Sequence, residues 1–413
     1  MKRTILIISR LLLGSVFVFS GFVKAIDPLG FTYKIEDYLT AMGPFMEQFS
    51  GLAFIASVLL SAVELVVGLN LVLGIRLRES NFGAALLMLF MTPLTLWIAL
   101  TNPVTDCGCF GDALVIDNWT TFWKNTVLCA LIIVIFLLRK EHRPFVRNRA
   151  QWIIAVYGFV FAIVLSIYCY RHLPLIDFRP YKIEANILEG MSVPENAPMD
   201  SFDIKLIYTK DGVEKEFALE NYPASDSTWT FVDQKTTLIK KGYEPPIHDF
   251  TITIDGEDIT QDMLANEGYT FLLIAYDLNK ANLAQAEKFN NIYRYAQQNG
   301  YDFYALTASL ASDIENYRKA SGAEYPFGFT DKITLKTIIR SNPGLMLIKN
   351  ATVIGKWHHN DLPEFRQPLE NSYLGKAELP DTKGRILIVA LLFFIPVLLI
   401  AGVDRFLKIK KEK

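Results

Sequence analysis

Two cysteines separated by one residue are the side chains whose type and spacing most directly indicate chemistry in this chain. They are Cys107 and Cys109, in the stretch DCGCFGD at residues 106–112, and only Cys129 and Cys169 join them in 413 residues. A disulfide that closes across a single residue is strained, and strained disulfides are more oxidising and exchange more readily. We therefore expect Cys107 and Cys109 to be catalytic residues of thiol–disulfide exchange.

Other interpretations of this pair stay open at the level of sequence. The pair is also compatible with a purely loop-shaping role or with half of a metal site. The histidines of the chain, among them His358 and His359, have no zinc-ligand spacing to the pair, so we expect no metal. Single buried cysteines are usually inert, but Cys169 has the depth in its apolar stretch to act as a relay.

Arg10 and Glu64 are ionisable residues inside apolar stretches. Arg10 lies about 9 Å into the first stretch and Glu64 about 15 Å into the second, both measured from the inner side at roughly 1.5 Å per residue. Charged groups are expensive in lipid and by default mark a function. We expect Arg10 and Glu64 to form an intramembrane pair that holds two helices together, with a proton or quinone role as the alternative.

Six apolar stretches are long enough to cross a bilayer as helices, which takes about 20 residues each. Apolar residues make up 51% of the chain and concentrate in these stretches. No small-residue cleavage site follows the first stretch, so we expect it to be retained and not removed as a signal peptide. The stretches are residues 4–23, 52–73, 82–100, 121–138, 151–169 and 386–403.

Lysines and arginines gather on one side of the predicted membrane. The loops 24–51 and 101–120 hold few of them, so both termini are expected in the cytoplasm and the cysteine loop outside. The long segment 170–385 then lies outside as well. This predicts a protein of the bacterial inner membrane with six transmembrane helices and a large periplasmic domain. The basic clusters are residues 2–3, 76–78, 139–149 and 405–413.

The outer segment has two kinds of pattern. Alternating residues at 202–208, a turn at 210–212 and a return at 213–219 predict a β-hairpin. Further along, strand and helix patterns alternate, and the continuous apolar run at 269–276 is typical of a strand covered on both faces. Acidic residues outnumber basic ones in this segment, which argues against a nucleic-acid partner.

The predicted fold class is multi-domain. We expect an α-helical membrane bundle of four helices with two flanking anchors, a β-rich extracytoplasmic unit and an α/β domain. The expected parts are a four-helix membrane domain at 1–140, a cytoplasmic link and fifth helix at 141–177, a small β-rich unit at 178–242, an α/β domain at 243–370, and a sixth helix with a basic tail at 371–413.

The first part resembles a known membrane family. Residues 10–24 (RLLLGSVFVFSGFVK), followed by Asp27 and Pro28, resemble the opening of DoxX-like membrane proteins. Glu64 and the CGCFG motif at 107–111 single out MauE-type proteins within that group. The resemblance implies a four-helix membrane protein that supports maturation of a disulfide-rich periplasmic enzyme, alongside a thioredoxin-like partner.

The α/β domain resembles the TlpA/ResA-type thioredoxin fold. The resemblance rests on PPIHDF at 245–250, the strand at 269–276 and NPGLMLI at 342–348. Where the family has its Cys-x-x-Cys, this chain has Asp-Leu-Asn-Lys at 277–280, and the domain contains no cysteine. The catalytic role of that family therefore does not carry over.

The same resemblance suggests a surface for partners. It places Pro343 at the cis-proline of the thioredoxin fold, where a cis X-Pro bond needs a particular local context. Beside it, Tyr325 and Phe327 would line a groove that receives an extended peptide. We expect Pro343, Tyr325 and Phe327 to be partner-binding residues.

Two functions of different class follow from these residues. The first is thiol–disulfide redox chemistry outside the cytoplasm that supports folding or maturation of exported proteins. A quinone is the one cofactor that this chemistry suggests. The second is a non-enzymatic membrane scaffold whose thioredoxin-like domain binds a partner. Both functions imply the lipid membrane and an extracytoplasmic protein client or thioredoxin-like partner.

Overall fold

The computed structural model divides the chain into two compact units. Residues 1–185 and 251–413 form the larger unit, and Asn186–Phe250 form the smaller one. The larger unit holds the membrane helices and the α/β domain, and the smaller unit holds a three-stranded sheet. The structure describes residues 1–104, 106–210, 212–224, 226–240, 242–372, 374 and 382–412.

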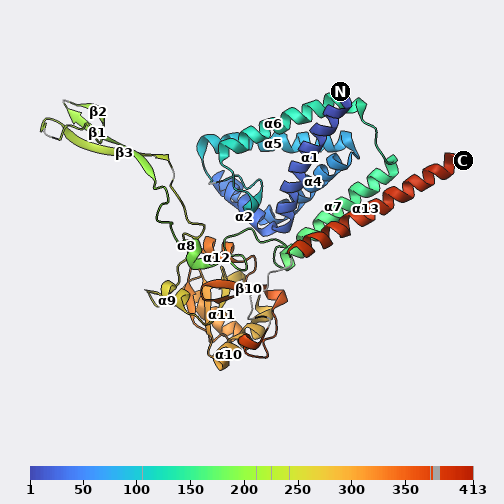
Figure 1. Ribbon diagram of the computed structural model, residues 1–413. Helices are drawn as coiled ribbons and strands as arrows, with labels where there is room; N and C mark the ends of the chain where they lie inside the picture. The colour runs from blue at the N-terminus through green and yellow to red at the C-terminus, as the bar shows by residue number, and fades with distance from the viewer. Residues whose placement is uncertain are drawn as a thin grey trace. The chain divides into compact units, whose positions relative to one another are not determined.

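Among these described residues, six helices are long and apolar enough to cross a membrane. Each corresponds to one of the six apolar stretches of the sequence, and most extend a few residues further at both ends. Figure 1 shows α5 alongside α6 and α13 alongside α7, and these helices contact each other. The six are α1 (Lys2–Ile26), α4 (Ala53–Leu73), α5 (Leu77–Thr101), α6 (Asn118–Leu138), α7 (Asn148–Arg171) and α13 (Thr382–Glu412).

Small residues let α1 and α4 pack closely. A Cβ at Gly14 would lie 2.8 Å from a methyl group of Val72, and a Cβ at Gly21 would lie 2.4 Å from the backbone nitrogen of Leu65. Larger side chains would force the two helices apart, and such small-residue contacts are how helices approach each other in membranes. These contacts run in opposite directions along the two helices, so they fix an antiparallel register.

A helix that the sequence patterns did not indicate, α2 (Pro28–Ala41), follows α1 directly. Asp27 caps it, because Asp27 Oδ1 accepts a hydrogen bond from the Gly30 backbone N–H at 2.9 Å. Pro28 occupies the first helical position, where its missing N–H is no loss. Ser57 of α4 donates to the Pro28 carbonyl at 2.8 Å, so α2 is attached to the bundle. A single turn, α3 (Pro44–Glu47), follows it.

The α/β domain is built on a seven-stranded sheet in the order β10-β9-β6-β7-β8-β4-β5. Strand β6 (Tyr269–Ala275) pairs in parallel with β7 (Asp302–Thr307) and antiparallel with β9 (Gly344–Lys349). All seven β6 residues are buried, as its continuous apolar sequence predicted. The other strands are β4 (Thr253–Ile254), β5 (Glu257–Asp258), β8 (Phe327–Phe329) and β10 (Thr352–His358).

Four helices connect these strands. The order of β6, α10, β7, α11 and the β9–β10 hairpin gives a thioredoxin-like α/β domain, so the predicted fold class is confirmed. The Asn342–Pro343 peptide bond is cis, as the resemblance predicted. The helices are α9 (Thr260–Ala265), α10 (Ala286–Asn299), α11 (Ala311–Ser321) and α12 (Lys332–Ile338).

The smaller unit contains an antiparallel sheet in the order β2-β1-β3 (Figure 1). The predicted hairpin is present as its first two strands, although Asp211 of the predicted turn lies outside the described residues. Tyr208 packs against Phe217 and Phe231, with ring centroids 6.0 and 5.6 Å away. Its elements are α8 (Ile187–Met191), β1 (Ser201–Lys210), β2 (Val213–Ala218) and β3 (Thr230–Lys240).

Candidate functional site

The two neighbouring cysteines lie in the loop between α5 and α6. The loop ends at Asp117, whose Oδ1 accepts a hydrogen bond from the Thr120 N–H at 2.9 Å and starts α6. Gly108 has φ +61°, and a Cβ there would lie 2.9 Å from Lys34 Cγ of α2. Both the left-handed backbone and the close approach require glycine, so Gly108 lets the cysteine loop press against α2.

Cys107 is the less accessible of the two thiols. Its side chain is 6% exposed, and its Sγ lies 3.8 Å from Thr121 Oγ1 of α6. The Cys109 backbone N–H donates to Cys107 Sγ at 3.3 Å, and the Tyr38 hydroxyl of α2 donates to the Cys107 carbonyl oxygen. Side chains of two helices and the backbone of the loop therefore all hold Cys107 in place.

Cys109 is partly exposed and lines a small cavity inside the helix bundle, where polar and apolar side chains meet. The cavity has a volume of about 30 Å³, enough for a water molecule. The Cys109 carbonyl oxygen lies 2.7 Å from Ser20 Oγ, so the loop is tied to α1. Cys109 thus meets charged and polar groups from three helices. The polar side chains of the cavity are Ser20, Lys24, Glu64, Lys124 and Asn125.

The two thiols have different acidities. A hydrogen bond from Cys107 and the charges of Lys124 and Lys24 lower the pKa of Cys109 to about 6, against the opposing effects of burial and of Glu64. The same hydrogen bond, together with burial, raises the pKa of Cys107. Near neutral pH, Cys109 is therefore a thiolate and Cys107 beside it stays a protonated thiol.

Glu64 is paired with Lys24, and the expectation of an Arg10–Glu64 pair is corrected here. Lys24 Nζ lies 2.9 Å from both carboxylate oxygens of Glu64, and both side chains are buried. Ser20 Oγ is 2.8 Å from Glu64 Oε2. The glycine contacts between α1 and α4 set this register, which brings the C-terminal end of α1 opposite Glu64. Depth measured from the helix ends alone did not reveal that offset.

Arg10 lies opposite the end of α4 instead. Its Nη1 is 3.3 Å from His142 Nδ1, and a Cβ at Gly74 would lie 2.1 Å from that same Nη1. His142 Nε2 is 3.0 Å from the Gly74 carbonyl oxygen, so Arg10 and His142 both gather at the C-terminal turn of α4. This contact joins α1 to the segment after α6 and takes no part in the cysteine site.

The remaining two cysteines lie in other environments. Cys169 is 2% exposed and packs among Ala25, Ile26 and Leu165. Cys129 Sγ lies 3.4 Å from Thr92 Oγ1, where α6 packs on α5. Cys169 therefore packs against the C-terminal end of α1, and its role as a relay stays a prediction.

The three residues expected to bind a partner do not form an open groove. Tyr325 is fully buried in the hydrophobic core of the α/β domain, so its ring does not reach a partner, and Pro343 is buried as well. Phe327 is partly exposed and packs against Tyr325, with ring centroids 5.4 Å apart. The expectation for Tyr325 is corrected, because its aromatic side chain fills the interior between strand and helix.

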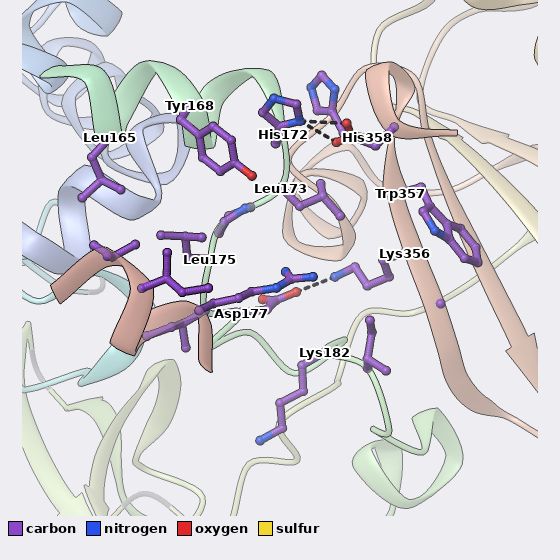
Figure 2. Close-up of a pocket in the computed structure, with 18 of the residues that line it drawn as sticks. Leu165, Tyr168, His172, Leu173, Leu175, Asp177, Lys182, Lys356, Trp357 and His358 are labelled. Carbon is purple, nitrogen blue, oxygen red and sulfur yellow. Dashed lines mark hydrogen bonds and ion pairs between the residues drawn. The ribbon is translucent and has the colours of Figure 1, made fainter. Parts of the chain in front are cut away.

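A second and much larger pocket lies between α7, α13 and β10 (Figure 2). Its volume is about 1130 Å³, and Tyr168 of α7 contributes to its apolar wall. Its charged groups are largely paired, with His172 Nδ1 2.7 Å from Asp361 and Lys356 Nζ 2.6 Å from Asp177. Burial lowers the pKa of Lys356 to about 8 even beside Asp177. None of the described residues lining it is a cysteine, so this pocket is separate from the cysteine site.

Metal-binding side chains do not gather in the part of the chain that the structure describes. No group of three or more histidine, cysteine, aspartate or glutamate residues has the arrangement to hold an ion. His359 Nδ1 is instead 2.9 Å from Ser341 Oγ, next to the cis-proline.

Comparisons with known proteins cover the membrane region and the small sheet. Residues 2–138 match the family "Methylamine utilisation protein MauE". This range contains both cysteines of the loop as well as Lys24, Glu64 and Lys124. Residues 202–241 match a domain of unknown function, DUF8463. No curated protein matches the chain.

One solved structure with similarity to this chain is the solution structure of a protein from Bacteroides thetaiotaomicron that is provisionally described as a protein disulfide isomerase. The two are 17% identical, with a TM-score of 0.24, and the match covers 28% of this chain and 77% of that one. The finer resemblances, to DoxX-like and to TlpA/ResA-type proteins, stay predictions.

Several residues of the site were missed by the sequence patterns. The sequence patterns place Lys24 at the start of a predicted loop and Lys124 in a predicted membrane helix, and they indicate a role at the cysteines for neither. Lys34 and Tyr38 belong to α2, which was not predicted, although an aspartate followed directly by proline is a recognised helix start. Periodicity reveals which face of a helix is apolar, but it does not reveal which lysine reaches a loop distant in sequence.

Proposed function

We propose that this membrane protein carries out thiol–disulfide exchange outside the cytoplasm and so supports the folding or maturation of exported proteins. The observation that carries the proposal is the arrangement of the two thiols: the Cys109 backbone N–H donates to Cys107 Sγ at 3.3 Å, and Cys109 shares a cavity with Lys24 and Lys124, whose charges favour its thiolate. A thiolate is the nucleophile of such exchange, and a pKa near or below ambient pH keeps it populated. The positive-inside rule supports an external position for the loop.

The reaction proceeds in two balanced steps. Cys109 thiolate attacks one sulfur of a protein disulfide, the partner's S–S bond breaks, and the leaving thiolate takes up a proton. Cys107 then loses its proton and attacks Cys109 Sγ, which breaks the mixed disulfide and releases the second partner thiol. Two electrons pass from the cysteine pair to the partner, and the reverse sequence oxidises a dithiol partner.

The unequal acidities suit this order of events. While Cys109 is a thiolate, its charge and its hydrogen bond with Cys107 favour the protonated form of Cys107. Once Cys109 is consumed in a mixed disulfide, that charge is gone and Cys107 loses its proton more easily. A complete cycle requires a second redox partner, for which a thioredoxin-like dithiol protein or a membrane quinone has the appropriate chemistry.

Trapping the mixed disulfide tests the proposal. In cells that express Cys107→Ser, the second step is blocked, so Cys109 should accumulate in disulfide-linked complexes that reducing agent dissolves. Mass spectrometry of the complexes identifies the client. Cys109→Ser should give no such complexes, and Cys129→Ser serves as a matched control that leaves the trap intact.

The contrary result is equally specific. If Cys107→Ser forms no mixed disulfide, and if a double serine variant leaves function and partner redox state unchanged, the exchange chemistry is refuted. That outcome would favour the non-enzymatic scaffold, in which the thioredoxin-like domain binds a partner and the cysteines only shape the loop.

A further inference from the structure

Helix α2 lies between the cysteine loop and the thioredoxin-like domain. Its residues toward the loop are Phe31, Lys34 and Tyr38, spaced by three and four as on one helix face. Its residues toward the domain, Tyr33 and Glu36, lie three apart on a different face. Helix α2 therefore contacts the cysteine loop on one face and the domain on another.

Arg340 is the principal contact from the domain. The residue is 6% exposed, and its Nε lies 3.0 Å from both carboxylate oxygens of Asp27, the N-cap of α2. Its Nη2 donates to Asp112 Oδ2 at 3.0 Å, three residues after Cys109. One guanidinium therefore joins the start of α2 to the end of the cysteine loop. Burial alone would lower the pKa of Arg340, but Asp27 and Asp112 raise it, so the group stays charged.

A second set of contacts follows along α2. Lys336 Nζ stands over the Tyr33 ring, 3.8 Å from its centroid, and lies 4.0 Å from Glu36 Oε2. Tyr276, at the end of β6, packs edge-on against Tyr33 with centroids 6.4 Å apart. The domain thus covers the outer face of α2 over more than one turn.

The opposite face of α2 covers the cysteine loop. Lys34 Nζ is 2.7 Å from Asp106 Oδ2, and the Tyr38 hydroxyl donates to the Cys107 carbonyl oxygen. The ring centroid of Phe31 lies 4.6 Å from Lys24 Nζ, so Phe31 covers the cation beside Cys109. A shift of α2 away from the bundle would release all three contacts together.

We propose that α2 is a lid over the cysteine loop and that Arg340 is the positioning residue that holds it closed. The inference builds on the proposed exchange at Cys109. A protein client reaches Cys109 only while the lid is open, so the position of the cysteine-free domain sets the rate of exchange. This gives the domain a role that requires no thiol of its own.

The test measures access to Cys109 directly. Full-length protein in lipid nanodiscs is treated with a membrane-impermeant maleimide, and mass spectrometry follows alkylation of Cys109. Arg340→Ala should speed alkylation by at least about tenfold, the factor that corresponds to roughly 1.4 kcal/mol of lost closure. Arg366→Ala is the control, because Arg366 is exposed and pairs with Glu364 of the same domain.

A variant on the other side of the contact should act in the same way. A Cβ at Gly30 would lie 2.8 Å from Arg340 Nη2, so Gly30→Ala inserts a methyl group between α2 and the domain. Arg340→Lys keeps the charge but not the planar fork that spans Asp27 and Asp112, so its rate should be intermediate. If Arg340→Ala fails to fold, the rates of Cys109 alkylation in Gly30→Ala and Arg340→Lys test the lid instead.

The pH profile distinguishes positioning from a general loss of structure. Opening removes Lys34 and Tyr38 of α2 but leaves Lys24 and Lys124 beside Cys109, so the midpoint of Cys109 alkylation should stay near 6 while the rate rises, whereas loss of structure would raise the midpoint toward the ordinary cysteine value. An unfolded protein would instead expose Cys129 and Cys169 as well. The titratable and charged groups facing Cys109 are Cys107 and Asp106 of the loop, Lys24 of α1, Lys34 and Tyr38 of α2, Glu64 of α4 and Lys124 of α6.

The lid and the exchange chemistry fail independently. Unchanged alkylation in folded Arg340→Ala and Gly30→Ala proteins overturns the lid, even if Cys107→Ser still traps a client. Faster alkylation in these variants, without any trapped client in Cys107→Ser cells, supports the lid and refutes the exchange.

Discussion

The cysteine loop and the thioredoxin-like domain differ in what they contain: the loop has the neighbouring thiols, and the domain has the fold but no thiol. In the loop, Cys109 sits between Lys24 and Lys124, and their charges stabilise a thiolate. At the corresponding place of the domain, Asp277 caps the short turn Leu278–Lys280 and lies 3.8 Å from Lys332. The thioredoxin-like domain contains no thiol, and the neighbouring thiols of this chain lie in its helical membrane region. A fold alone therefore does not locate the chemistry, which depends on the residues of a site.

The two regions also differ in how their buried charges are arranged. Where the segment after α7 meets the domain, Asp177 lies 2.7 Å from Arg179 Nε and 2.6 Å from Lys356 Nζ of β10, and the opposite charges satisfy each other. In the loop, the cations near Cys109 outnumber Glu64, the acid that faces them. The first arrangement stabilises a fixed structure, while the second favours formation of a new negative charge on sulfur.

The largest expected effect tests the charges of the loop region. Lys24→Met leaves Glu64 buried without its partner, which should lower the free energy of unfolding by about 3–5 kcal/mol. The double variant Lys24→Met/Glu64→Leu removes both charges and should recover most of that loss. Thermal unfolding in detergent measures both. Equal instability of the single and double variants would show that Lys24 is needed for more than its pairing with Glu64.

The next effect tests whether Tyr325 belongs to the domain core. Tyr325→Ala should lower the free energy of unfolding by about 3 kcal/mol, because it empties a fully buried site. Phe329→Ala is the matched control, since Phe329 is 56% exposed, and should change stability by less than about 0.5 kcal/mol. If Tyr325→Ala weakened client binding and left the melting temperature unchanged, the partner-groove interpretation would return.

A pH effect on the domain should be smaller. Burial, with further contributions from His359 and His172, lowers the pKa of His358 to about 3. The free energy of unfolding is therefore independent of His358 ionisation above the unfolded-state pKa of about 6.5. It falls as the pH drops from there toward 3, with a limiting slope of about 1.4 kcal/mol per pH unit, because the unfolded chain binds a proton that the folded protein does not. Thermal unfolding between these pH values measures the slope, and His358→Gln should flatten it. An identical slope in the variant would assign the acid sensitivity to other groups.

The smallest expected effect concerns the short turn that follows β6 in the domain. Lys280→Ala removes an exposed side chain at the end of this turn, and we expect no change in exchange beyond about twofold. Exchange is read as the rate at which the full-length protein reduces a disulfide-bonded peptide. A large loss of rate would mean that this turn contacts the client, and the division between the two regions would be less complete.

Sequence patterns predicted the fold better than the site. The six apolar stretches and the buried strand β6 were found, because length and hydrophobic continuity are local properties. The pairing of Glu64 was predicted incorrectly, since close glycine contacts between two helices set the register. Helix α2 was missed although Asp27 and Pro28 form a local start signal, and the bridging role of Arg340 was missed because contacts 228 and 313 positions apart leave no local pattern.

The proposed exchange depends on a Cys109 thiol acidic enough to be a thiolate near neutral pH, and the pH dependence of Cys109 alkylation measures that acidity. Full-length protein in nanodiscs is treated with iodoacetamide across a series of pH values, and the rate at Cys109 is read by mass spectrometry. We expect the rate of Cys109 alkylation to rise with pH through a midpoint of about 6, with Cys107 remaining largely unmodified. A midpoint near the ordinary cysteine value of about 8.5 would show that no thiolate is stabilised there, and the proposed exchange would lose its physical basis.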